Sequence, residues 1–101
     1  MTRIDRYPVD IPPDLQRLQH CEFESRGTTY LIEIQESDIS RLCWTDRGTC
    51  FDPNLAPTFE LRVYEYDAKN GYRGLSGQFS RAEEIDAFYG IETAQIQRSL
   101  N

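Results

Sequence analysis

The sequence predicts an α+β domain in which one antiparallel sheet of about four to six strands, a meander of hairpins, carries short helices at both ends. Three observations support this. The middle of the chain alternates apolar and polar residues between glycine-bearing turns, and residues 80–100 have helical spacing. No stretch alternates strands with helices, as a parallel sheet requires. Residues 1–101 are expected to form a single domain.

The N-terminal part is expected to be extended and then briefly helical. Residues 1–11 form the predicted arm, because its prolines restrict the backbone. Residues 12–20 are predicted as a short helix, since Pro13 suits the first helical position and Leu15 and Leu18 share one face.

Residues 21–79 are predicted to be antiparallel strands. The first pair, 21–26 and 28–35, alternates apolar with polar side chains and turns at Gly27, a residue that tolerates positive φ. A second pair is expected at 39–45 and 49–51, although a short helix at 37–43 remains an alternative.

The second hairpin has two possible registers. A two-residue loop, Asp46-Arg47, would place Cys43 opposite Cys50. A type I turn followed by a bulge at the next glycine would place Trp44 opposite Cys50 instead. The sequence does not choose between them.

The third hairpin joins the clearest strand, residues 58–67, to a returning strand at 72–79. Its Asn70-Gly71 dipeptide favours a two-residue turn. That turn would place Tyr66 opposite Leu75 and Arg62 opposite Phe79.

This register makes the sheet apolar on both faces. One face carries Phe59, Leu61 and Val63, and the other carries Tyr64, Tyr66, Leu75 and Phe79. A bulge near Gly74 or Gly77 would instead move Phe79 to the first face.

Helices are predicted over 80–100. Ser80 and Glu83 have the spacing of a capping box, and the following helix is expected to end at Gly90. Its apolar side is Ala82, Ile85, Phe88 and Tyr89. A further short helix is expected from Ile91, with Thr93 as its cap.

Charge and hydropathy exclude several classes of protein. Seventeen acidic residues against 11 basic ones give a net charge of -6, which argues against nucleic-acid binding because that function favours clustered basic residues. No apolar run is long enough to span a membrane, and the N-terminus lacks the apolar segment of a signal peptide. A cytoplasmic location is therefore expected.

The candidate catalytic and metal-ligating residues are few. Cys21, Cys43 and Cys50 have no paired metal-ligand spacing, and the single histidine, His20, is adjacent to the first of them. We therefore predict no metal, no cofactor and no catalytic residues. The alternative is a homo-oligomeric ligand-binding protein or enzyme whose interface site uses His20 and a cysteine. A structural subunit of a larger complex is a further alternative.

These observations favour a non-enzymatic acidic protein–protein interaction module, such as a small inhibitor, immunity or adaptor protein. Its partner is expected to be a protein, with a basic surface as the complementary chemistry, and a homodimer remains open. Tyrosine and arginine are common in interface hot spots. The predicted partner-binding residues are Tyr64, Tyr66, Arg62, Tyr72, Arg73, Asp46 and Asp52.

Overall fold

A computed structural model describes residues 10–96, apart from the side chains of Tyr72 and Arg73. Most of the predicted arm, residues 1–9, and the C-terminal residues 97–101 lie outside the described residues. The described elements, in chain order, are α1 (Pro13–Gln16), β1 (Glu22–Ser25), β2 (Thr28–Glu36), β3 (Leu42–Thr45), β4 (Gly48–Phe51), β5 (Phe59–Asp67), β6 (Gly71–Phe79), α2 (Ala82–Tyr89) and the 3-10 helix η1 (Thr93–Gln95).

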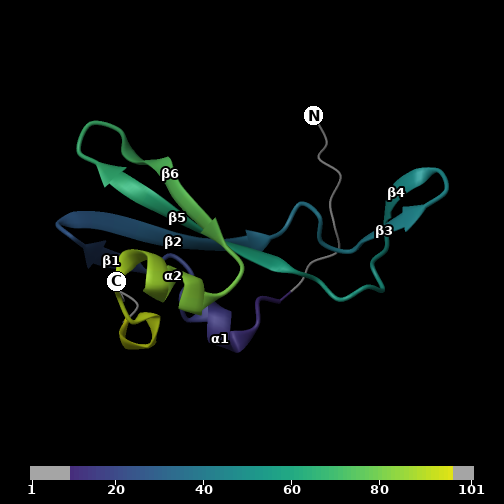
Figure 1. Cartoon of the computed structure of the whole chain (residues 1–101), viewed down its shortest axis with the longest axis horizontal. Helices are drawn as coiled ribbons and strands as arrows, with labels where there is room; N and C mark the ends of the chain where they lie inside the picture. The colour runs from purple at the N-terminus through teal and green to yellow at the C-terminus, as the bar shows by residue number, and fades with distance from the viewer. Residues whose placement is uncertain (1–9, 97–101) are drawn as a thin grey trace.

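The strands form two sheets rather than one. Four antiparallel strands pair in the order β1-β2-β5-β6, and β3 pairs with β4 in a separate two-stranded sheet. Figure 1 shows this β3–β4 hairpin projecting away from the four-stranded sheet. The α+β class is confirmed, whereas the prediction of a single sheet is wrong.

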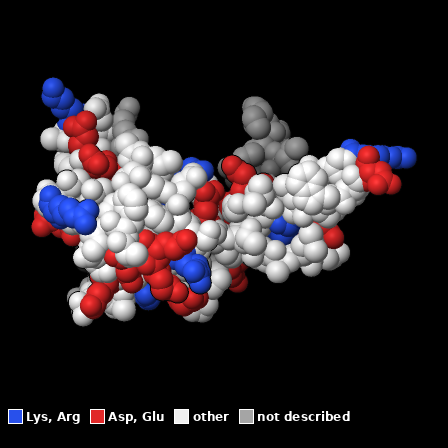
Figure 2. All heavy atoms as spheres, in the orientation of Figure 1, with Lys and Arg blue, Asp and Glu red and all other residues white. Residues whose placement is uncertain are grey.

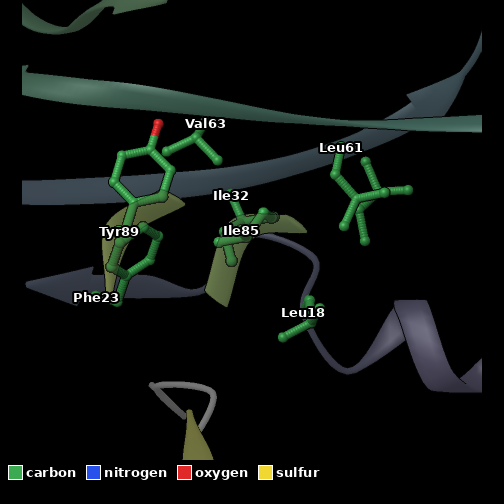
Figure 3. Packing of buried hydrophobic residues seen from close by; sticks show 8 residues of the cluster. Leu18, Phe23, Ile32, Leu61, Val63, Ile85 and Tyr89 are labelled. Atoms are coloured by element: carbon green, nitrogen blue, oxygen red, sulfur yellow. The ribbon is translucent and has the colours of Figure 1, made fainter. Parts of the chain in front are cut away.

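The core lies between the helices and one face of the four-stranded sheet, here called the inner face. Strands β2 and β5 contribute Ile32, Ile34, Leu61 and Val63, and the helical side contributes Leu18, Ile85 and Tyr89 (Figure 3). The aromatic ring of Phe23, on β1, packs edge-on against Tyr89. The opposite face of the sheet is called the outer face below.

The N-terminal helix is shorter than predicted. Helix α1 covers only Pro13–Gln16, although it does begin at the predicted proline. The chain leaves the helix because His20 adopts a φ of 61° and its N–H donates a hydrogen bond to Ile32 O at 2.8 Å. The backbone has therefore already joined β2 where the prediction continued the helix to residue 20. The side chain of Leu18 is nevertheless fully buried.

Helix α2 begins one residue later than its capping box predicted. Arg81 is the N-cap, and the carboxylate that accepts hydrogen bonds from the preceding backbone belongs to Glu84 rather than Glu83. The helix ends as predicted at Gly90, whose φ of 68° is left-handed. Within residues 91–96 the predicted last helix is only the 3-10 turn η1, and residues 97–101 of that prediction lie outside the described residues.

The first two hairpins have two-residue loops. Ser25 pairs with Thr28 across Arg26 and Gly27, both of which have positive φ, the signature of a type I′ turn. In the second hairpin Cys43 pairs with Cys50, so the structure selects one of the two registers left open above. The alternative helix at 37–43 does not form; this segment is a turn followed by the start of β3.

The third hairpin corrects the predicted register. Asp67 pairs with Gly71 across a three-residue loop, because the Asp67 carboxylate accepts hydrogen bonds from Lys69 N at 2.8 Å and Asn70 Nδ2 at 2.9 Å. A bulge at Ser76 then shifts the ladder, since Tyr64 pairs with Leu75 while Val63 pairs with Gly77.

This bulge decides which aromatic residues face the core. Phe79 lies opposite Leu61 rather than Arg62, and its ring packs against Phe88 and Tyr89 on the inner face. Leu75 lies opposite Tyr64 rather than opposite Tyr66 as predicted, although it does share the outer face with both tyrosines. The two-residue-turn prediction that Phe79 belongs to the outer face is therefore wrong, and the bulged alternative is confirmed for Phe79.

A buried ion pair anchors the β3–β4 hairpin to the large sheet. Glu36, at the end of β2, accepts hydrogen bonds from Arg41 Nε at 2.7 Å and Arg41 Nη2 at 2.9 Å. Ser40 Oγ donates to the same carboxylate at 2.7 Å and accepts a bond from Thr58 N. Arg41 also lies over the Phe51 ring, 4.9 Å from its centroid. These contacts turn the chain out of β2 before β3 begins, which is why β3 does not extend the large sheet.

Candidate protein-binding face

An apolar row crosses the outer face of the four-stranded sheet. Leu31 of β2 pairs with Tyr64 of β5, which pairs with Leu75 of β6, and residues directly opposite one another on paired strands point to the same side. We call these three residues the outer row. Tyr66, two positions after Tyr64, has the same orientation by strand alternation.

Part of this apolar surface is exposed to solvent. Tyr66 is 48% exposed and Leu75 is 49% exposed, whereas Tyr64 and Leu31 in the middle of the sheet are half-buried. The helices lie on the inner face, as Figure 1 shows, so they do not cover this row. An exposed apolar surface framed by polar residues is characteristic of interaction sites.

Carboxylates frame the outer row on the outer face. By strand pairing and alternation, Glu22, Glu24 and Glu33 share this face with Leu31, and Glu60 shares it with Arg62. Among the side chains that the structure describes, four carboxylates and the guanidinium of Arg62 thus share this face. Acidic side chains also gather over α2 in the view of Figure 2, so negative charge is not confined to the outer face. What the outer face adds to the carboxylates is an apolar row that runs across three paired strands.

Arg62 is held at the centre of this charge pattern. Its Nε lies 3.6 Å from Glu60 Oε2, within ion-pair distance, and it sits opposite Glu33 on β2. The Tyr64 hydroxyl, and to a smaller extent the charge of Glu60, raise the pKa of the Arg62 guanidinium. Arg62 therefore remains charged beside the tyrosine.

The structure brings together only part of the predicted site. Arg62, Tyr64 and Tyr66 share the outer face of β5, whereas Tyr72 and Arg73 belong to β6 with side chains that lie outside the described set.

The two predicted aspartates lie elsewhere. Asp46 is in the loop of the β3–β4 hairpin, and Asp52 directly follows β4, where its carboxylate accepts a hydrogen bond from Asn54 N at 2.9 Å. Figure 1 places that hairpin at one end of the molecule and the β5–β6 turn at the other. Asp46 and Asp52 therefore do not join the tyrosines in one surface.

The alternative site, a histidine paired with a cysteine, is also separated. His20 lies beside β2, where its Nε2 is 4.0 Å from Glu33 Oε2, whereas Cys43 and Cys50 lie in the projecting hairpin. Cys21 is buried in the core region and its thiol donates to Arg17 O at 3.0 Å. Across residues 10–96, no cluster of three or more histidine, cysteine or acidic side chains has the geometry to hold a metal ion. None of the helices in that range is long and apolar enough to cross a membrane.

Sequence reasoning missed Leu31 and the glutamates around it. Their signal was present, because Leu31 alternates with the inward-facing Tyr30 and Ile32, but its partner strand was unknown. Only the β2–β5 register, a long-range pairing, shows that Leu31 meets Tyr64. The exposure of Trp44, at 85%, was likewise not foreseen.

No family model, curated protein or solved structure matches this chain. Function is therefore inferred from the residues of the outer face.

Proposed function

We propose that this chain is a non-enzymatic protein-interaction module that binds the basic surface of a protein partner through the outer face of its four-stranded sheet. The observation that supports this most directly is the outer row, with Tyr66 beside it and carboxylates around it. Asp46 and Asp52 are not part of this proposed surface, since they lie on the β3–β4 hairpin.

The chemistry of the face defines the partner. The exposed tyrosine ring and leucine side chain offer apolar contact area, and the four glutamates favour lysine or arginine around an apolar centre. Glu60 pairs with Arg62, and Glu22, Glu24 and Glu33 add further negative charge around the apolar row. Such a complex weakens as salt screens the charges.

The test is affinity capture of the partner from the cell that makes the protein, followed by titration of the purified pair. Tyr64→Ala together with Tyr66→Ala is expected to weaken binding by at least about 100-fold, because central interface tyrosines are frequent hot spots. Binding of the unaltered protein is expected to weaken with added salt. The matched control is Trp44→Ala, which removes a more exposed aromatic ring from the distant hairpin.

Each outcome is decisive. Loss of binding in the tyrosine variant, with normal binding by Trp44→Ala, supports the outer face. Equal binding by both variants refutes it, and loss only in Trp44→Ala moves the interface to the hairpin. If the captured partner is a second copy of this chain, the basic-partner proposal is wrong and the face is a homodimer interface.

A further inference from the structure

Two thiols face each other in the projecting hairpin. Cys43 of β3 and Cys50 of β4 are directly opposite residues, and their Sγ atoms are 2.6 Å apart. Cys50 is exposed and Cys43 is half-buried, so solutes reach the pair from solvent. Cys21 provides a natural contrast, because it is fully buried and distant in the fold.

The turn of the hairpin fixes this pairing. Thr45 Oγ1 donates to Gly48 O at 2.9 Å and accepts a hydrogen bond from Arg47 N at 3.2 Å. Because the register is held, the two thiols approach one another without rearrangement of the backbone, which is the geometric requirement for a disulfide.

We propose that Cys43 and Cys50 form a thiol–disulfide exchange site whose substrate is a low-molecular-weight disulfide and whose product is a disulfide bond across the β3–β4 hairpin. This site is separate from the outer face, so it stands whether or not the proposed function is correct.

The exchange takes two balanced steps. The Cys43 thiolate attacks one sulfur of the small disulfide RSSR, the S–S bond breaks, and one RS⁻ leaves, which produces a mixed disulfide. The Cys50 thiol then loses its proton to solvent and attacks Cys43 Sγ, and the second RS⁻ leaves. In total the protein gives up two electrons and two protons, and RSSR becomes two RSH.

The proximity of the two sulfur atoms supports two separate steps. The Cys43 thiol, followed by smaller contributions from desolvation and nearby charge, raises the pKa of the Cys50 thiol. Because the two sulfur atoms are 2.6 Å apart, one thiolate disfavours a second beside it, so one thiol of the pair keeps its proton until the mixed disulfide has formed.

The disulfide would change how the hairpin presents Trp44. A two-stranded hairpin with four-residue strands is marginally stable on its own. Trp44 pairs with Thr49 and, by alternation, lies on the opposite side of the hairpin from the two sulfur atoms. The bond therefore leaves Trp44 exposed and restricts the motion of the strand that carries it.

The experiment uses the reduced full chain and oxidised glutathione as the probe. The mass of the chain is expected to fall by two hydrogen atoms, and peptide mapping is expected to find Cys43 linked to Cys50. The number of free thiols, counted after unfolding, is expected to fall from three to one. Closure is expected to be about tenfold faster than in concentrated urea, because the fold holds the two thiols together. Amide hydrogen exchange in β3 and β4 is expected to slow by about tenfold or more, with the four-stranded sheet unchanged.

The control moves one thiol to the other side of the hairpin. Thr49→Cys combined with Cys50→Ser keeps three cysteines but places the two hairpin thiols on opposite sides, and it is expected to stop at mixed disulfides. Cys50→Ser alone is expected to hold one glutathione at Cys43. The proposal is overturned if the unaltered protein accumulates only mixed disulfides, if the bond involves Cys21, or if the relocated thiol closes equally fast.

Discussion

At the scale of single residues, the ion pair between Glu36 and Arg41 anchors the β3–β4 hairpin to the four-stranded sheet. The Arg41 side chain is 4% exposed and that of Glu36 is 16% exposed, so protein groups rather than water satisfy most of both charges. Glu36→Ala is expected to lower the free energy of unfolding by about 3 kcal/mol, because it removes the carboxylate that accepts hydrogen bonds from two nitrogens of the buried Arg41 guanidinium.

Urea denaturation measures this effect, and Glu24→Ala is the matched control. Glu24 is an exposed strand carboxylate, and its loss is expected to cost less than about 0.5 kcal/mol. Equal stability of the two variants would show that the ion pair does not anchor the hairpin.

Gly77 makes room for an aromatic ring. A Cβ at this position would lie 2.8 Å from Phe79 Cε2 and Cζ, whereas a Cβ at Gly74 meets nothing within 4 Å. Gly77→Ala is therefore expected to destabilise the protein by about 1–2 kcal/mol relative to Gly74→Ala, through displacement of the Phe79 ring. Thermal unfolding compares the two variants, and a Gly77→Ala protein as stable as Gly74→Ala would mean that the ring does not rest on Gly77.

At the scale of elements, the start of helix α2 depends on one carboxylate. Glu84 Oε1 accepts hydrogen bonds from Ser80 N at 2.7 Å and Arg81 N at 3.0 Å, and these bonds lower the pKa of Glu84. Because the pKa of Glu84 is lower in the folded state, the ionised carboxylate stabilises the protein fully at pH values above its unfolded-state pKa of about 4.3. This stabilisation is lost as the pH falls through the folded-state pKa.

Glu84→Gln is therefore expected to lower Tm at pH 7, and the difference from the unaltered protein is expected to disappear in strong acid. Glu83→Gln, in the same helical turn, is the control and is expected to change Tm less. A Glu84→Gln effect that stays constant from neutral to acid pH would contradict the role of the ionised carboxylate.

Local sequence patterns predicted the bounds of several strands and helices but not the register between β5 and β6. Alternation located β2 and β5 within a residue or two, and Pro13 and Gly90 marked the start of α1 and the end of α2. The β5–β6 register was missed because Asp67 closes a longer turn with its own side chain. The local sequence alone does not reveal that the three-residue loop closed by Asp67 is preferred to a two-residue Asn-Gly turn.

At the scale of the whole molecule, long-range contacts determine the number of sheets and the residues that share the outer face. Two sheets form because Glu36 and Arg41 turn the chain out of β2, and a pairing of charges five positions apart is not distinguishable from ordinary surface charge in the sequence. The tyrosines of β5 were predicted for the site, but their neighbour Leu31 required the β2–β5 register. Asp46 and Asp52 were grouped with them only because the projection of the hairpin was unknown.

The two faces of the four-stranded sheet therefore differ in composition and in exposure to solvent. The helices bury the inner face in the core, and the outer face keeps an apolar row among carboxylates. We therefore propose that a basic protein contacts this outer face.

Photo-crosslinking inside the cell that makes the protein tests this contact. A photoreactive phenylalanine analogue replaces Leu75 on the outer face or, in a matched variant, Glu83 on the exposed side of α2. We expect a covalent adduct with a basic protein from position 75 and no adduct with that protein from position 83. An adduct with that protein from position 83 alone, or none from position 75, would contradict it.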